Sequence, residues 1–233
     1  MADLISVSEA ASLVRLDPSR VRALAASGQI PAVRVGRNWA IDRTDALELA
    51  RSTRPPGRPF GPGNAWALLF LASGQDPEWI DSNVASRLRR SLRLEGLRVL
   101  APRLGRRGKM RRFRAHAGEV PHLLSDAEFR ASGISAAGAH RLDLVSANEV
   151  DGYLRASQLN RFARTHALDE AALGDSSNVA LSLVPDDAWH IDQGVPAAAV
   201  ALDLIEEHDP RAVKAGEVLL RRLAAGEQVI GRR

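Results

Sequence analysis

The first fifty residues restrict the fold most strongly, because start, stop and turn signals follow one another there at short intervals. Asp17 followed by Pro18 is typical of the start of a short helix, and Gly28 is typical of its end. Two alternating apolar segments then flank Gly36-Arg37-Asn38, which predicts a β-hairpin. We therefore expect a small helical unit that carries a two-stranded ribbon.

The helices predicted in this unit each have one apolar face. A first helix is expected over residues 9–15, capped by Ser8, and a third over residues 42–50 with Leu47 and Leu49 facing the core. The residues expected to face inward on the first two helices are Ala10, Ala11, Val14, Val21, Leu24 and Ala25.

The outward residues of the second helix and of the hairpin are mostly polar or cationic. A cationic helix beside a cationic hairpin can enter a groove of DNA and hold the adjacent backbone. The residues expected to contact bases or phosphates are Ser19, Arg20, Arg22, Arg34, Arg37 and Asn38.

Four short motifs occur in order within residues 1–52: Ser8-Glu9-Ala10-Ala11, Val21-Arg22, Gly28-Gln29-Ile30-Pro31 and Val35-Gly36-Arg37-Asn38-Trp39. With them the segment resembles the excisionase/MerR-like winged helix-turn-helix family. The resemblance implies a DNA-reading domain that places its second helix in the major groove and its wing along the backbone. Asp17, near the start of that helix, is a departure because it reduces the positive charge.

Charge is distributed unevenly over the 233 residues, although the net charge is only +4. Residues 84–116 contain twelve basic residues and a single acid, Glu95, whereas residues 117–233 contain 11 basic and 18 acidic residues. We expect the basic segment to contact a polyanion through Arg87, Arg90, Arg106, Arg107, Lys109, Arg111 and Arg112. The competing interpretation is that it contacts the acidic C-terminal region, within one chain or between chains.

The expected fold class is α+β, in four segments. After residues 1–52, residues 53–62 form a linker rich in proline and arginine, which either lies against phosphate or is a solvated spacer. Residues 63–116 are expected to form a second, basic winged-helix-like unit, with helices over 65–73 and 84–94 and a strand after the 105–108 turn. Residues 117–233 are expected to form an acidic mixed domain with helices over 120–130, 158–167, 195–207 and 211–224 and strands over 142–145, 149–155 and 178–184.

The C-terminal half carries a second resemblance. Its motifs are Gly133-Ile134-Ser135-Ala136-Ala137, the block 149–168, Val184-Pro185-Asp186-Asp187-Ala188-Trp189, Ala201-Leu202-Asp203-Leu204 and Asp209-Pro210-Arg211-Ala212. Over residues 61–225 the chain resembles AbiEi-type antitoxin and transcriptional regulators of toxin–antitoxin pairs. This resemblance implies an autoregulator that binds its own promoter and counters a nucleotidyltransferase-like toxin, with no implication that it touches the toxin directly.

The sequence indicates neither catalysis nor a cofactor. The six histidines show no metal-ligand spacing, phosphate-binding glycine motifs and the serine-nucleophile motif are absent, and the absence of cysteine excludes disulfides and thiolate sites. Asp186, Asp187 and Asp192 are interpreted as an acidic turn, and an enzyme would require a metal or nucleotide at residues 175–192. No signal pattern is visible, and the apolar run 65–72 is too short to cross a bilayer, so we expect a cytoplasmic chain without a membrane partner.

We therefore expect a DNA-binding transcriptional regulator of the antitoxin type that binds double-stranded DNA, as a homodimer if its operator is palindromic. Two alternatives remain open. The acidic C-terminal domain could neutralise a protein partner, with DNA binding secondary, or the chain could act as a phage excisionase-like architectural protein.

Overall fold

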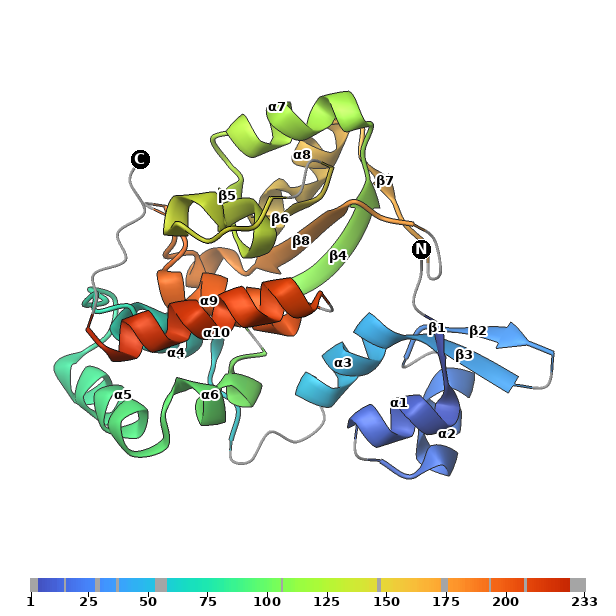
Figure 1. Cartoon of the computed structure of the whole chain (residues 1–233), viewed down its shortest axis with the longest axis horizontal. Coiled ribbons are helices and arrows are strands. Elements are labelled where there is room, and N and C mark those ends of the chain that lie inside the picture. The colour runs from blue at the N-terminus through green and yellow to red at the C-terminus, as the bar shows by residue number, and fades with distance from the viewer. Residues whose placement is uncertain are drawn as a thin grey trace.

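The computed structural model describes residues 4–226 except 15, 28–29, 37, 53–57, 106, 146–147, 173–175, 193 and 208, and of residues 48, 51 and 52 it describes the backbone alone. Figure 1 shows an N-terminal unit (residues 4–52) beside a larger C-terminal part (residues 58–226). Each part has its own β-sheet. None of the helices in the described part of the chain is long and apolar enough to cross a membrane.

The N-terminal unit is a three-stranded antiparallel sheet with three helices. In chain order its elements are β1 (Leu4–Ser6), α1 (Val7–Val14), α2 (Pro18–Ala26), β2 (Ala32–Val35), β3 (Asn38–Asp42) and α3 (Arg43–Ser52). The predicted hairpin is confirmed as β2 and β3, and the strand order is β1-β3-β2. The sequence did not predict β1, which pairs Ile5 with Ile41 and so closes one side of the core.

The start of α1 differs from the prediction. Ser6, not Ser8, caps this helix, because the Glu9 amide donates to Ser6 Oγ (3.2 Å) and the Ser6 amide donates to the Glu9 carboxylate (2.8 Å). This reciprocal pair is a capping box, and it places Ser8 inside the first turn. Among the described side chains of α3, Ala46 is fully buried, and of the two predicted leucines Leu49 packs against the core.

The core of the N-terminal unit has the predicted inner residues. Ala10, Ala11, Val14, Val21, Leu24 and Ala25 are all buried, together with Ile30 and Ile41. The predicted helix stop at Gly28 lies outside the described residues, and α2 ends at Ala26 with Ser27 as its C-cap.

The C-terminal part is built on a five-stranded sheet with the order β5-β6-β8-β4-β7. Its strands are β4 (Lys109–Arg114), β5 (Arg130–Ala131), β6 (Val150–Arg155), β7 (Asp169–Glu170) and β8 (Val179–Val184). The pair β6·β8 is parallel and the other pairs are antiparallel. The predicted strand over 142–145 is not formed.

Helices cover both faces of this sheet (Figure 1). They are α4 (Pro62–Ala72), α5 (Ser82–Glu95), α6 (Leu97–Leu100), α7 (Val120–Ser125), α8 (Leu159–Thr165), α9 (Ala197–Glu206) and α10 (Pro210–Ala224). Neighbouring strand residues point to opposite faces, so Leu154 packs with Phe162 of α8 whereas Tyr153 packs with Trp66 of α4 and the α9 side. The predicted helix over 120–130 ends at Ser125, and the Asp209 cap with Pro210 in the first turn of α10 is confirmed.

Residues 63–116 do not fold as a separate winged-helix-like unit. Strand β4 pairs with β8 and β7, both of which come from beyond residue 117. Residues 65–69 of α4 are fully buried in one cluster with Tyr153, Trp189 and Leu202. An apolar α4 cannot be covered by the basic helix α5 alone, so it is buried against the later half of the chain.

Candidate nucleic-acid interface

The start of α2 is fixed by a local cap. The Asp17 carboxylate accepts a hydrogen bond from the Ser19 amide (2.8 Å), and Pro18 occupies the first turn, where no amide proton is needed. Hydrogen bonds from the Ser19 hydroxyl and amide lower the pKa of Asp17 below its usual value. The acidic residue that departs from the positive charge expected of this helix, Asp17, therefore has a structural role as the helix cap.

The outer face of α2 is exposed, as predicted. Ser19, Arg20 and Arg22 lie on it, followed by the small residues Ala23 and Ala26. Arg20 has no ion-pair partner among the described residues, whereas Arg22 lies in the electrostatic field of Asp17. Short side chains beyond the two arginines allow the helix axis to come close to another surface.

The hairpin presents a second exposed surface beside α2. Arg34 lies over the Trp39 ring, with its guanidinium carbon 5.9 Å from the ring centroid, and Val33 and Val35 are 38% and 58% exposed. Gly36 has a φ of 61°, which the turn requires and which a residue with a Cβ rarely adopts. Asn38 is exposed opposite Val35, and the predicted contact residue Arg37 lies outside the described residues.

Arg107 corrects one of the predicted DNA contacts, because its side chain is 8% exposed. The guanidinium donates to Asp203 and to Glu206, at 2.8 Å each, and to the Tyr153 hydroxyl at 3.2 Å. Its pKa stays well above the usual value because the charges of Glu206 and Asp203 outweigh the effect of burial. A guanidinium held in this way cannot reach a phosphate.

Several other cations of the basic segment are paired with the chain's own carboxylates. Arg111 pairs with Glu170 (2.7 Å), and Arg112 lies 3.9 Å from Asp42 of the N-terminal unit. Outside the predicted set, Arg89 pairs with Asp76, Arg98 with Glu217 and Arg103 with Glu95. The competing interpretation, contact with acidic residues of the same chain, therefore holds for Arg107, Arg111 and Arg98.

The remaining predicted contacts of this segment are free to meet a ligand. Arg87 and Arg90 of α5 and Lys109 of β4 are exposed, and in the described structure none of them has an ion-pair partner. Arg106 lies outside the described residues. The described cations of the basic segment thus separate into a set that is paired with carboxylates of the chain and a set that is exposed and unpaired, which the sequence alone did not distinguish.

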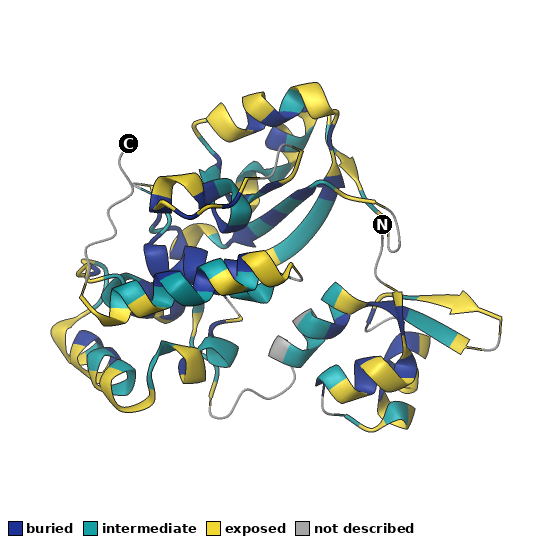
Figure 2. Ribbon diagram, in the orientation of Figure 1, coloured by how far each residue is buried: buried dark blue, intermediate teal, exposed yellow. Residues whose placement is uncertain are grey.

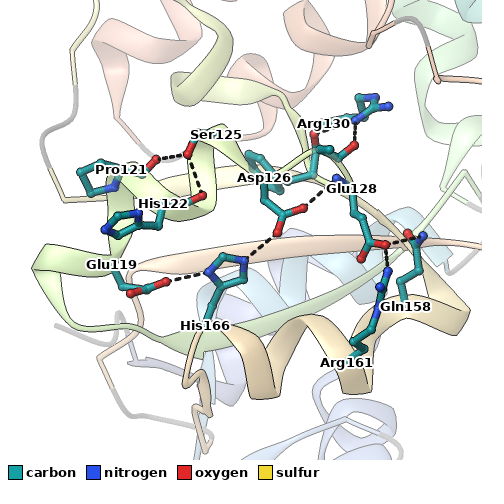
Figure 3. A network of polar contacts seen from close by, with 12 residues as sticks. Glu119, Pro121, His122, Ser125, Asp126, Glu128, Arg130, Gln158, Arg161 and His166 are labelled. Carbon is teal, nitrogen blue, oxygen red and sulfur yellow. Dashed lines mark hydrogen bonds and ion pairs between the residues drawn. The ribbon is translucent and has the colours of Figure 1, made fainter.

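Sequence reasoning missed a polar network that joins α7 to α8 (Figure 3). His166 Nδ1 lies 2.7 Å from Glu119 and His166 Nε2 lies 2.9 Å from Asp126, and Arg161 pairs with Glu128. Burial lowers the pKa of His166, but the hydrogen bonds to Glu119 and Asp126 outweigh it and raise the pKa above its usual value.

The acidic turn, which an enzyme would need as a metal or nucleotide site, makes internal contacts. Asp186 accepts from Ser157 (2.5 Å), and Asp192 accepts from Trp189 Nε1 and from Arg155 (2.7 Å each). Within the described ranges no group of three or more histidine, aspartate or glutamate side chains is arranged to hold a metal ion.

Comparison with known proteins bears on the N-terminal unit. Residues 4–54 match the family model for a helix-turn-helix domain. Searches of the curated proteins and of the solved structures found no match to the chain. The predicted class, α+β with an N-terminal helix-turn-helix domain, is thereby confirmed, and the match supports the excisionase-like resemblance. Such a domain indicates DNA binding, and α2 is the second helix of this one.

Proposed function

We propose that the chain is a transcriptional regulator that binds double-stranded DNA through its helix-turn-helix domain. The observation that carries the proposal is the exposed cationic start of α2, next to an exposed hairpin, in a domain that matches a helix-turn-helix model. Ser19, Arg20 and Arg22 would lie nearest base edges or phosphates in the major groove, and Arg34, Arg37 and Asn38 would follow the backbone.

The more specific proposal is an antitoxin that represses its own promoter and counters a nucleotidyltransferase-like toxin. It is supported by the AbiEi-like motifs of residues 133–212 and by the presence of a large second part whose core is separate from that of the DNA-binding domain. One such domain reads few base pairs, so the proposal includes a homodimer on two half-sites one helical turn apart. The proposal assigns no catalytic step and no cofactor to the chain. It includes a location in the cytoplasm, where the promoter DNA would be bound.

One structural observation favours this function over neutralisation of a basic partner by the acidic C-terminal region. Four carboxylates of that region, Glu170, Asp203, Glu206 and Glu217, already pair with arginines of the same chain. The acidic excess counted from the sequence therefore overstates the negative surface that a partner would meet.

The test is a binding titration with the DNA upstream of the gene. Arg20→Ala with Arg22→Ala is expected to weaken binding at least tenfold and to reduce the dependence of log K on log salt by about 1.8, at about 0.9 for each lost phosphate contact. Arg164→Ala with Arg211→Ala is the matched control, because both side chains are exposed in the C-terminal part and the charge change is the same. Equal affinities of the two double variants would reject the assignment of α2.

A further inference from the structure

Helix α5 carries a row of arginines that the rest of the described chain leaves unpaired. Arg87, Arg90 and Arg93 are spaced three residues apart and are all exposed, and the described structure places no carboxylate within ion-pair distance of them. By contrast Arg89, on the flank of the same helix, pairs with Asp76. The helix therefore has one arginine that is paired with a carboxylate of the chain and three that are exposed without such a partner in the described structure.

The exposed face contains no acid. At 100° per residue, Asn83, Ser86 and Leu94 share an arc with the three arginines, and all of them are exposed. The two acids at the ends of the helix are engaged, since Asp81 caps the first turn and Glu95 lies 3.8 Å from Arg103. We call Asn83, Ser86, Arg87, Arg90 and Arg93 the α5 arginine face. It offers hydrogen-bond donors and positive charge without a compensating carboxylate.

We infer that the α5 arginine face is a second contact with the DNA backbone, outside the site read by the helix-turn-helix domain. The inference rests on the proposed function and adds to it a surface in the other part of the chain. The three arginines extend over roughly 9 Å of helix axis, a length over which one DNA strand presents two to three phosphates. Charge complementarity selects a polyanion, and serine and asparagine beside the arginines are typical donors to phosphate oxygens.

The position of α5 gives the inference a geometric consequence. In Figure 1 α5 and the helix-turn-helix domain lie at opposite ends of the lower edge of the molecule. In Figure 2 the outer side of α5 is exposed along its length. A duplex that meets both surfaces must extend beyond the base pairs that α2 and the wing cover. Wild-type protein should therefore bind a long duplex more tightly than one trimmed to the helix-turn-helix site.

The first experiment compares two triple variants of the full chain on the long promoter duplex. Arg87→Ala, Arg90→Ala and Arg93→Ala together are expected to weaken binding roughly tenfold or more at low salt and to reduce the salt slope by about 2.7, at about 0.9 per phosphate. The control, Arg89→Ala with Arg98→Ala and Arg111→Ala, removes the same charge from arginines that are already paired with acids. It should change the slope by less than about 1.

The second experiment needs no variant, since it measures wild-type affinity for the long and the trimmed duplex. The α5 triple variant should bind both with the same affinity, because it has lost the contact that distinguishes them. The inference would be overturned if the wild type bound the two duplexes with equal affinity, or if the triple variant bound the long duplex as tightly as the wild type. Binding that depends on Arg20 and Arg22 would be unaffected by either result, so the proposed function would remain. A wild-type chain that binds no duplex would overturn the proposed function and this inference together.

Discussion

Arg107 and Lys109 lie two residues apart in one run of cations but have opposite surroundings. Lys109 is exposed at the start of β4, whereas Arg107 is enclosed by Tyr153, Asp203 and Glu206. The Arg107 carbonyl also accepts from Trp66 Nε1 (3.1 Å), which fixes the backbone against α4. Burial, together with the charge of Asp203, raises the pKa of Tyr153 well above its usual value, so the hydroxyl remains a neutral donor to Asp203.

Replacing Arg107 tests whether this cation serves the fold. Arg107→Met leaves Asp203 and Glu206 without their buried counter-charge, and breaking a buried pair costs about 3–5 kcal/mol of unfolding free energy. Lys109→Met, at an exposed position, should change it by no more than about 0.5 kcal/mol. Urea unfolding of both variants measures the difference. A stable Arg107→Met protein with weakened DNA binding would instead return Arg107 to the set of DNA contacts.

At the level of elements, the connection between α7 and α8 depends on one histidine. Both ring nitrogens of His166 lie within hydrogen-bond distance of a carboxylate, and only the doubly protonated ring can donate to both. The side chain is buried beside the Phe162 ring, with centroids 4.5 Å apart. Glu119 and Asp126 precede His166 by 47 and 40 residues, so no local motif could have revealed the network.

The network predicts a pH dependence of stability. Because the folded state raises the pKa of His166, its contribution is complete below about pH 6.5, the usual unfolded value, and is lost as the pH rises through the folded pKa. One proton gives a slope of at most about 1.4 kcal/mol per pH unit. His166→Gln should remove the contribution of the histidine to this slope, so the curve measured by urea unfolding from pH 6 to 9 should be less steep than that of the wild type.

A second group changes stability in the same direction and must be separated from His166. Burial, followed by the charges of Glu207, Glu149 and Asp203, raises the pKa of Asp151 to about 8. The contribution of the protonated Asp151 carboxyl to stability is lost as the pH rises from about 4, the usual pKa of an aspartate, to about 8, its pKa in the folded state. Asp151→Asn should remove that part and leave the His166 part. Parallel curves for wild type and His166→Gln would contradict the role of the histidine.

Elements with local signals were predictable, and those with distant partners were not. Asp17-Pro18 and Gly36-Arg37-Asn38 specify α2 and the hairpin within a few residues, so the helix-turn-helix domain followed from sequence. The predicted helix over 120–130 ended early because the Asp126 carboxylate accepts from the Glu128 amide (2.7 Å) and from His166. The strands that pair with β4 lie more than fifty residues later in the chain. The basic residues around β4 led us to predict a separate basic unit in place of a strand of the larger sheet.

On the scale of the whole molecule, the helix-turn-helix domain has a core of its own. The cluster around Val21 and Ile41 shares no described residue with the clusters of the C-terminal part. Those clusters are joined to one another, since Leu220 and Leu223 pack against two of them and Ala131 against another pair. Between the two parts, Arg112 lies 3.9 Å from Asp42, a separation at which an ion pair contributes little.

Separate cores predict that the two parts open independently. Ile41 and Ile191 are both fully buried, one in each part, and shortening either to valine should cost about 0.5–1.5 kcal/mol. Ile41→Val should therefore lower hydrogen-exchange protection roughly two- to tenfold in β3 and α1 and leave β6 and β8 unchanged, because exchange reports the opening of each cooperative unit. Ile191→Val should give the reverse pattern. If either substitution lowered protection throughout the chain, the domain would unfold together with the rest. The contact at Arg112 and the contact of α3 with residues Ala101–Leu104 would then couple two cores that share no described residue.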